Sequence, residues 1–165
     1  MEVSTVRYPG DMYEVLKWAV NRQLKDIPPE FEEWLLGLMP EKCREITGHH
    51  LNVHTSQTPC VDGWVKGYPH SHTWSVNWPP DTYTCVTFLT MSDEGGEFAL
   101  GGNAHDDPYE IFMPEAGTTV TFDAMRWHGV RPVTRGTRIS LLTSGFPDWE
   151  DYKRRKREHG RDEYF

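Results

Sequence analysis

The sequence has few cysteines and no long hydrophobic run, and each absence excludes a class of protein. Its three cysteines, Cys43, Cys60 and Cys85, lie far apart and form no CxxC pair, which predicts free thiols in a reducing compartment. No stretch approaches the length of a membrane span, and the N-terminal residues lack the apolar core of a signal sequence. We therefore expect a cytoplasmic protein with no membrane partner.

Positive charge is scarce outside one short run near the C-terminus. The 165-residue chain has a net charge of -8, although residues 153–157 contribute +5, so the remainder carries -13. Such a surface is poorly suited to following the phosphates of nucleic acid. A basic run of this kind is typical of a solvated helix end or tail, and docking to nucleic acid or a membrane stays open as the alternative.

The length and the pattern of the chain predict a single domain over residues 1–165. Within it we expect supporting helices in residues 1–45 and a jelly-roll core in residues 46–147. A charged C-terminal helix or tail is expected to follow in residues 148–165.

The first forty residues have helical patterns. Asp11 and Glu14 form a capping box ahead of apolar residues at helical spacing. The Pro28-Pro29 pair interrupts this helix, and Pro29 can begin a second one, whose apolar stripe lies within residues 31–38.

After Pro40 the pattern changes to alternation and short apolar runs. Gly-, Pro- and Asp-rich turns separate seven expected strands, at residues 51–55, 83–91, 97–100, 109–112, 118–122, 129–134 and 137–144. Many short strands with regular turns predict a mainly β fold with N-terminal helices, of the sandwich or jelly-roll type.

The stretch from His128 to Ser140 has the clearest chemical content. An imidazole stands ten residues before Arg138, with a Thr-Arg-Gly turn between two β-prone segments. If both segments are strands, the turn brings Arg138 back toward His128, so that an anion on the guanidinium can lie beside a metal ion on the imidazole. Ser140 shares a strand face with Arg138 and can donate its hydroxyl to the same carboxylate. This arrangement suits a small dicarboxylate bound to a metal ion.

A second histidine pair, His70 and His72, can complete a metal site. In an extended segment, residues two apart point to the same face, so both imidazoles can reach one ion. His128 would supply a third ligand from across the barrel and leave positions for a bidentate substrate and dioxygen. Imidazole suits iron, copper, zinc and nickel alike, so the ligand type by itself does not choose the metal.

Four segments together resemble the iron(II)/2-oxoglutarate-dependent oxygenases, nearest to the small prolyl-hydroxylase-like type. The family's Pro-His-x-Asp motif corresponds to Tyr68–His72, and its central strand with a Gly-Gly-Glu turn corresponds to Cys85–Leu89 with Gly95–Phe98. Its Pro-x-x-Gly strand corresponds to Pro114–Phe122, and its distal His-to-Arg stretch corresponds to His128–Ser140.

The resemblance implies a double-stranded β-helix and a hydroxylase that uses Fe(II), O2 and 2-oxoglutarate, with succinate and CO2 as coproducts. His70, His72 and His128 would hold the iron, while Arg138 and Ser140 would bind the 2-oxoglutarate side-chain carboxylate. The prime substrate, whether a peptide, a small molecule or a nucleobase, stays unidentified. Aromatic residues near the metal motif suit any of these, and equally suit packing of a long loop: Trp64, Tyr68, Trp74 and Trp78.

One position departs from the family pattern, since His72 stands where the family has a carboxylate. Three hypotheses follow: a three-histidine site, a two-histidine site completed by water or by a loop acid such as Asp62 or Asp81, or no functional metal site. Two other functions stay open as well. One is a cupin-like three-histidine dioxygenase or isomerase without 2-oxoglutarate, and the other is a catalytically inactive binding module.

The remaining histidines and arginines of these segments are assigned no function. Ordinary strand or surface positions are expected for His49, His50, His54, His159, Arg131 and Arg135. Arg126 and Trp127, just before His128, are expected either to line the substrate mouth or to be structural.

Overall fold

The computed structural model describes residues 3–21, 26–57, 81–102, 107–108 and 110–159. It contains strands and helices in the following order along the chain: β1 (Ser4–Arg7), α1 (Met12–Val20), α2 (Pro29–Leu38), the short 3-10 helix η2 (Glu41–Cys43), β2 (Thr47–His54), β3 (Tyr83–Thr90), β4 (Glu94–Gly95), β5 (Phe98–Leu100), β6 (Glu110–Phe112), β7 (Thr118–Asp123), β8 (His128–Val130), β9 (Val133–Arg135), β10 (Arg138–Gly145) and α3 (Trp149–His159).

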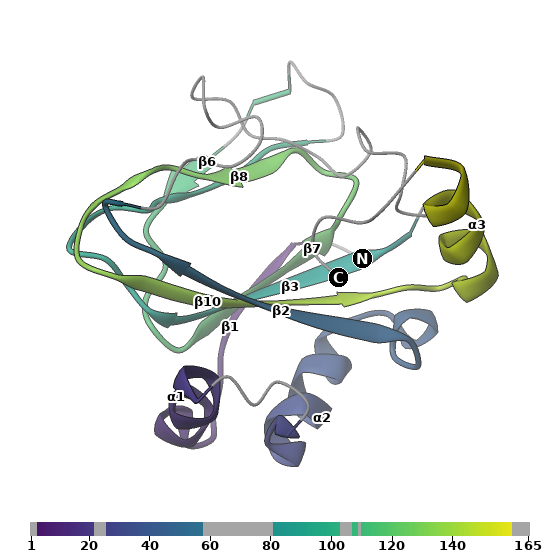
Figure 1. Ribbon diagram of the computed structural model, residues 1–165, viewed down its shortest axis with the longest axis horizontal. Helices are drawn as coiled ribbons and strands as arrows, with labels where there is room; N and C mark the ends of the chain where they lie inside the picture. The colour runs from purple at the N-terminus through teal and green to yellow at the C-terminus, as the bar shows by residue number, and fades with distance from the viewer. Residues whose placement is uncertain (1–2, 22–25, 58–80, 103–106, 109, 160–165) are drawn as a thin grey trace.

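The strands form two facing layers, as in a jelly roll (Figure 1). One layer is a five-stranded antiparallel sheet in the order β1-β7-β3-β10-β2. The other contains the three-stranded sheet β6-β5-β8, and a small pair, β4-β9, lies beside them. Strand neighbours in the large sheet are far apart in sequence, which is the hallmark of a double-stranded β-helix. The predicted fold class is confirmed.

Helices α1 and α2 cover the outer face of the large sheet (Figure 1). The Asp11 side chain caps α1 by accepting a hydrogen bond of 3.0 Å from the backbone N–H of Tyr13, and Pro29 is the first residue of α2. Their apolar faces meet the sheet in one core cluster, which includes Val15, Trp18, Phe31, Leu35, Cys85 and Leu141. The helices expected in the first forty residues are therefore present.

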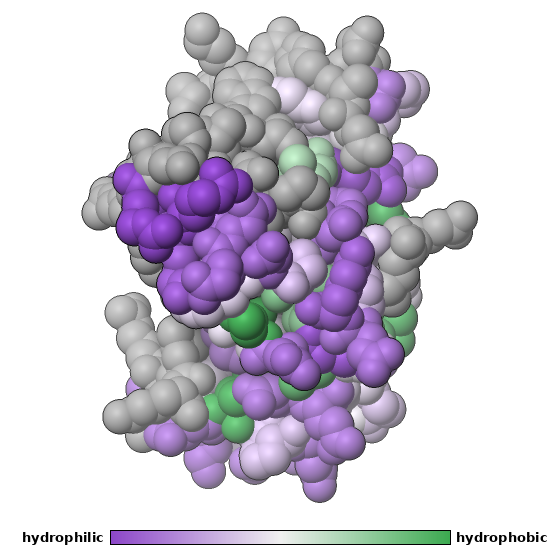
Figure 2. All heavy atoms as spheres, turned by 90° about the vertical axis from the view of Figure 1, so that its right-hand side faces the viewer, coloured by the Kyte–Doolittle hydropathy of each residue, from purple (hydrophilic) through white to green (hydrophobic). Residues whose placement is uncertain are grey.

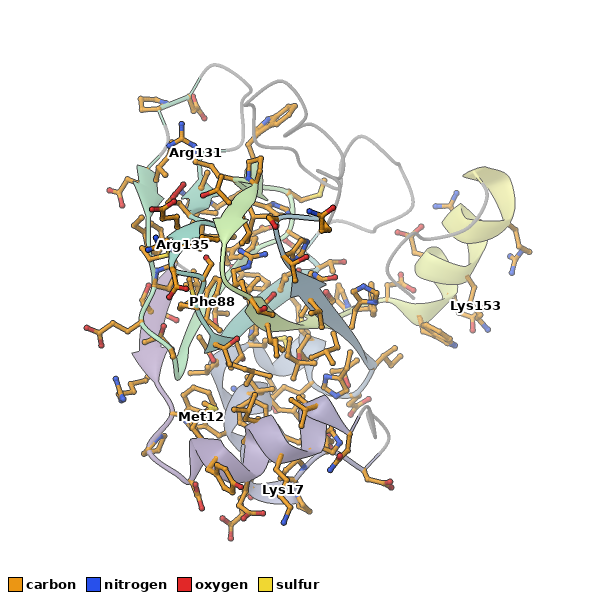
Figure 3. The ribbon with its side chains drawn as sticks, turned by 60° about the vertical axis from the view of Figure 1, so that its left-hand side comes forward. Met12, Lys17, Phe88, Arg131, Arg135 and Lys153 are labelled. Carbon is orange, nitrogen blue, oxygen red and sulfur yellow. The ribbon has the colours of Figure 1, made fainter. Side chains whose placement is uncertain are left out.

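A second core cluster fills the space between the two layers. Because side chains alternate along a strand, β3 directs Val86 and Phe88 inward and Cys85 and Leu89 toward the helices. Figure 3 shows Phe88 in this interior, above the helical layer that carries Met12. The Phe98 ring lies 5.8 Å from the Phe88 ring, measured between centroids. With both faces covered, β3 is buried along nearly its whole length, which agrees with its apolar and threonine side chains and its lack of charged residues.

Three details differ from the sequence-based expectation. Residues 4–7, expected within a helical region, form β1, which pairs with β7. The side chains of β1 are alternately half-buried and exposed. The expected strand 129–134 is two strands, β8 and β9, in different sheets. Pro132 lies between them and has no N–H for a ladder bond, while its carbonyl accepts from Gly96. The third detail is β4, a two-residue strand that depends on pairing with β9.

The C-terminal helix α3 projects beside the large sheet (Figures 1 and 3). It carries the whole basic run of residues 153–157, and Nζ of Lys153 lies 5.9 Å from the centroid of the Trp149 ring. The face of the molecule on this side is mostly hydrophilic, with small and separate apolar patches (Figure 2). Cys43 and Cys85 are buried free thiols. In the described ranges, no helix combines the length and the apolar character that crossing a membrane requires.

Candidate active site

Arg138 is a buried cation at the start of β10. The chain enters this strand through Gly136, whose φ of +87° forms the tight turn that the Thr-Arg-Gly sequence predicts. Arg138 is 2% exposed, and the centre of its guanidinium lies 5.9 Å from the centroid of the Phe88 ring. It is therefore not an ordinary surface arginine. Burial lowers its pKa from 12.5 to about 10, so it still carries its charge at neutral pH.

The Arg138 guanidinium has two hydrogen-bond partners and no carboxylate partner among the described residues. One terminal nitrogen, Nη1, donates to the Gly96 carbonyl at 3.2 Å, and the other, Nη2, donates to Nδ1 of His54 at 3.2 Å. Its Nε is buried without a hydrogen-bond partner in the described part of the chain. Burying a cation without a counter-charge is costly, so this environment indicates a site for an anion.

Ser140 adds a second donor to the same interior. It lies two residues after Arg138 on the inner face of β10, opposite Phe88 of β3, and it is 1% exposed. Its Oγ is the other buried side-chain atom that lacks a hydrogen-bond partner among the residues described. Buried polar atoms are normally satisfied. Two unsatisfied donors on one strand face match the two oxygens of a carboxylate.

His128, the first residue of β8, is held in one tautomer by a backbone carbonyl. Its Nδ1 lies 2.6 Å from the Arg126 carbonyl oxygen. Because a carbonyl only accepts, Nδ1 must be the protonated nitrogen, and in the neutral ring the lone pair is then on Nε2. The ring packs 4.9 Å from the Phe122 ring and is 7% exposed. A carbonyl that orients a ligating histidine in this way is typical of metal sites.

Arg126 and Trp127 hold the turn that presents His128. The Arg126 side chain donates from Nε to the Gly101 carbonyl at 2.7 Å, and the Trp127 backbone N–H donates to the Gly102 carbonyl at 2.8 Å. The Trp127 side chain is buried. Of the two expectations for this pair, the structural one agrees with these contacts.

The predicted ligands His70 and His72 lie outside the described residues, as does Asp62. Among the residues that are described, no three His, Cys, Asp or Glu side chains are grouped to hold a metal ion. The carboxylate of Asp81, the other acid considered as a ligand, lies 3.1 Å from Nζ of Lys42 in an exposed ion pair. Asp81 is therefore engaged at the surface.

The sequence analysis missed His54, which it assigned to an ordinary strand position. In the register of β2 and β10, His54 stands directly opposite Arg138 and accepts its hydrogen bond. Burial, and then the positive charges of Arg138 and His50, lower the pKa of His54 from 6.5 to about 4. The alternation of His50, Asn52 and His54 on one strand face was the available signal. Its meaning depended on knowing that β10 is the neighbouring strand.

The other histidine and arginines near the site have ordinary roles. His49 points to the helical side, where its Nδ1 lies 2.9 Å from the Thr143 hydroxyl and its Nε2 lies 3.4 Å from a Glu32 carboxylate oxygen. Arg131 and Arg135 make solvent-exposed ion pairs with Glu97 and Glu94.

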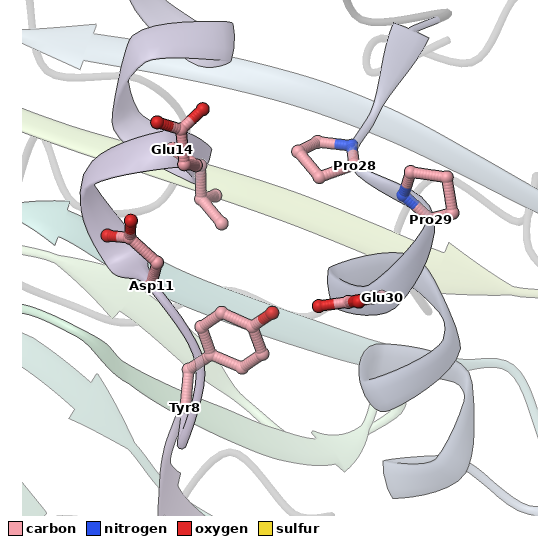
Figure 4. A pocket seen from close by; sticks show the side chains of 7 residues that line it. Tyr8, Asp11, Glu14, Pro28, Pro29 and Glu30 are labelled. Atoms are coloured by element: carbon pink, nitrogen blue, oxygen red, sulfur yellow. The ribbon is translucent and has the colours of Figure 1, made fainter.

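A cavity of about 430 Å³ lies elsewhere, between the first turns of α1 and α2 (Figure 4). Its lining includes three carboxylates, those of Asp11, Glu14 and Glu30, together with Tyr8. An acidic cavity does not suit a dicarboxylate. The buried Arg138 guanidinium is a separate feature, on the inner side of the large sheet.

Comparison with known proteins identifies the family. Residues 43–143 match the model of the 2OG-Fe(II) oxygenase superfamily, which covers more than half of the chain. The protein belongs to this superfamily. A search of curated protein sequences gives no significant match.

A search of solved structures finds further matches. An oxidoreductase of the 2OG-Fe(II) oxygenase family from Burkholderia pseudomallei is 17% identical, with a TM-score of 0.44 over 72% of this chain. The viral collagen prolyl hydroxylase of Paramecium Bursaria Chlorella virus-1, solved as a 2OG complex, is 15% identical, with a TM-score of 0.40 over 87% of this chain and 78% of its own. A prolyl-4-hydroxylase from Pseudomonas putida is 15% identical, with a TM-score of 0.39 over 87% of this chain and 69% of its own. The present chain spans 45% of the length of the Burkholderia protein.

The family's cofactor and cosubstrate are Fe(II) and 2-oxoglutarate, and the described residues fit both. Arg138 Nε and Ser140 Oγ, which have no hydrogen-bond partner among the residues that the structure describes, fit a carboxylate group. The His128 tautomer, set by the Arg126 carbonyl, fits a metal ion.

Proposed function

We propose that this protein is an Fe(II)- and 2-oxoglutarate-dependent hydroxylase that oxidises a C–H bond of an unidentified substrate, with succinate and CO2 as coproducts. The observation that carries the proposal is the buried Arg138 guanidinium, whose Nε lacks a described partner beside the equally unsatisfied Ser140 hydroxyl. Burying a charge of this kind without an anion near it is costly. A dicarboxylate cosubstrate would supply that anion.

Three histidines would hold the metal in this proposal: His70, His72 and His128. When bound, Fe(II) and 2-oxoglutarate supply the oxidising chemistry that the family shares. His128 would present Nε2 because Nδ1 is committed to the Arg126 carbonyl. The ion-paired carboxylate of Asp81 makes this acid a weaker candidate than His72 for the remaining position.

Arg138 and Ser140 would orient the cosubstrate through its side-chain carboxylate. The guanidinium carries one positive charge, and two of its N–H groups are already held by Gly96 and His54. Phe88 packs beside the guanidinium and Phe122 packs against His128, so both ends of the site have apolar walls that exclude water. In such surroundings a charge-assisted hydrogen bond is stronger than in solvent.

A three-histidine site would alter the electrostatics of cosubstrate binding. Imidazole ligands are neutral, so the divalent ion keeps its full charge, whereas a carboxylate ligand would cancel part of it. The doubly negative 2-oxoglutarate would then meet a more positive site, with Arg138 adding a further charge. We expect tight cosubstrate binding as a consequence.

An anaerobic titration tests the proposal. Metal-stripped protein receives Fe(II) and then 2-oxoglutarate, and the weak visible charge-transfer band of the chelate is followed. We expect the band in the wild type and its loss at matched concentrations in Arg138→Ala. Arg135→Ala is the control, because Arg135 is a nearby but exposed arginine paired with Glu94.

The other outcomes separate the alternatives. Iron binding without the band would favour the cupin-like three-histidine enzyme. Absence of iron binding would favour the inactive binding module. An unchanged band in Arg138→Ala would contradict the assignment of the anion site. The single-domain organisation and the cytoplasmic location are part of the proposal, and the prime substrate class stays open.

A further inference from the structure

His54 is one of the two residues that hydrogen-bond the Arg138 guanidinium. Strands β2 and β10 are antiparallel neighbours, and their register places His54 directly opposite Arg138 and Asn52 opposite Ser140. Residues opposite each other in a ladder point to the same face of the sheet. The imidazole therefore lies in the interior with the guanidinium, and Nη2 donates to its Nδ1 at 3.2 Å.

This hydrogen bond assigns the tautomer of His54. A guanidinium has donors only, so Nδ1 must be the unprotonated acceptor and the neutral ring carries its proton on Nε2. Burial and the charge of Arg138 lower the pKa of His54 to about 4, so the ring stays neutral at physiological pH. Protonation would remove the acceptor and place two cations side by side.

Two anchors, one between β4 and β5 and one on β2, fix the plane of the guanidinium. The Gly96 carbonyl holds Nη1, and His54 holds Nη2. A planar group anchored at both terminal nitrogens cannot rotate, so the direction of its Nε–H is fixed as well. Nε is the guanidinium nitrogen that has no partner among the described residues, and it belongs to the same strand face as Ser140 Oγ, which also has no described partner.

We propose that His54 is a positioning residue for the cosubstrate. It holds the Arg138 guanidinium in the orientation in which Arg138 Nε–H and the Ser140 hydroxyl can both donate to one carboxylate. The inference rests on the proposed 2-oxoglutarate site and adds to it a residue that does not itself need to contact the ligand. Loss of His54 leaves the charge of Arg138 in place but allows the guanidinium to rotate. Restoring the order of one such side chain on binding weakens affinity by roughly three- to tenfold.

The test uses substitutions that differ only in whether they keep an acceptor at the Nδ1 position. His54→Asn keeps one, because the amide oxygen lies near the place of Nδ1. His54→Leu removes it, and His54→Gln is a polar substitution whose amide reaches the Nε2 position instead. His50→Leu is the matched control, since His50 lies on the same face of β2 but opposite Leu142.

Two measurements are made on each variant. The first is the dissociation constant for 2-oxoglutarate, from anaerobic titration of the Fe(II) form. The second is the nitrogen NMR spectrum of the Arg138 side chain in the metal-free protein, where separate Nη signals report a guanidinium that rotates slowly. We expect His54→Leu and His54→Gln to raise the dissociation constant about three- to tenfold and to lose the separate signals. His54→Asn and His50→Leu should keep both wild-type properties.

The positioning role would be overturned if His54→Asn weakened 2-oxoglutarate binding as much as His54→Leu does. It would also be overturned if neither His54→Leu nor His54→Gln weakened that binding. Because His54→Gln tests the same point, the comparison survives a failure of the leucine variant to fold. The Arg138→Ala variant distinguishes failure of the His54 proposal from failure of the proposed 2-oxoglutarate site. If Arg138→Ala binds 2-oxoglutarate as the wild type does, the proposed site itself is wrong. If only Arg138→Ala weakens binding, the site stands and the role of His54 falls.

Discussion

The Nδ1 atom of His128 lies 2.6 Å from the carbonyl oxygen of Arg126, two residues earlier in the chain. The carbonyl is held in place by a turn, in which the Arg126 N–H donates to Asp123 O at 3.0 Å and the Met125 N–H donates to Asp123 Oδ1 at 2.9 Å. The backbone therefore decides the tautomer of the imidazole before any metal binds. An imidazole oriented in advance binds a metal ion without first losing rotational freedom.

Removal of the His128 imidazole is expected to abolish 2-oxoglutarate decarboxylation. The His128→Ala variant should lose turnover because no other described histidine is held in this orientation beside Phe122. Turnover is measured as succinate formed, with iron content determined in parallel. Unimpaired succinate formation would exclude His128 as a ligand.

His72→Asp is expected to keep or raise 2-oxoglutarate turnover. This substitution restores the carboxylate that the family has at this position, and a carboxylate suits Fe(II) as well as imidazole does. Iron binding and succinate formation are measured together. Complete loss of iron from His72→Asp would mean that the imidazole is required and that the site is specialised for three histidines.

Ser140→Ala should affect cosubstrate affinity and stability in opposite directions. Without ligand the Ser140 hydroxyl has no described partner, so its removal should leave the free energy of unfolding unchanged or slightly higher. With 2-oxoglutarate the lost hydrogen bond to a charged group should raise KM by about tenfold or more.

The control for Ser140→Ala is Ser144→Ala on the same strand. The Ser144 hydroxyl lies 3.2 Å from that of Thr84, so this variant should lose about 1 kcal/mol of stability with an unchanged KM. Chemical denaturation and initial-rate kinetics give the two quantities. The role assigned to Ser140 fails if both variants behave alike.

The free energy of unfolding is expected to fall in mild acid because His54 becomes protonated more readily in the unfolded chain than in the folded protein. Its pKa is lowered from 6.5 to about 4 in the folded protein, first by burial and then by Arg138 and His50. The unfolded chain therefore takes up this proton first as the pH falls. The contribution of His54 is complete above about pH 6.5 and is lost as the pH falls from about 6.5 toward about 4. Because the ring is only partly buried, the loss is on the order of 1–2 kcal/mol.

Denaturation of the wild type and His54→Asn between about pH 7.5 and about pH 4.5 measures this contribution. The asparagine side chain of the variant does not titrate, so the difference in stability between the two proteins should change over this range. A constant difference would show that His54 does not titrate as stated.

Gly96→Ala is expected to destabilise the protein and to weaken 2-oxoglutarate binding. Gly96 has a φ of +78°, and an added Cβ would lie 2.6 Å from Ser92 Oγ and 3.0 Å from Val133 Cγ2. The cost is about 1–3 kcal/mol, and displacement of the Gly96 carbonyl would release Nη1 of Arg138.

The matched substitution is Gly37→Ala in α2, where an added Cβ meets nothing within 4 Å. It should stabilise the protein by about 0.5–1 kcal/mol and leave 2-oxoglutarate binding unchanged. Thermal or chemical unfolding and the chelate titration distinguish the two variants. A stability gain in both would remove the steric argument at Gly96.

Local patterns in the sequence were enough to predict most of the elements. The capping residue Asp11 and the Pro28-Pro29 pair correctly predicted where α1 and α2 begin, because helix ends depend on nearby residues. The end of α1 at Val20, ahead of the expected break at Pro28-Pro29, was not predicted. The mostly apolar strand β3 and the turn at Gly136 were predicted from equally local patterns. By contrast, β1 was missed, since a four-residue strand is stable only through the partner β7, whose pairing is not a local property.

For the site, the order of the residues along the chain was enough to indicate a dicarboxylate beside a metal ion, through the spacing from His128 to Arg138. The folded structure was needed to find that Arg138 is buried, that its Nε and Ser140 Oγ have no partner among the described residues, and that His54 accepts a hydrogen bond from Arg138. These properties could not be predicted because burial and cross-strand register arise from the packing of segments far apart in the chain. His54 and Arg138 are 84 residues apart in the sequence and meet only because β2 and β10 are neighbours in the large sheet.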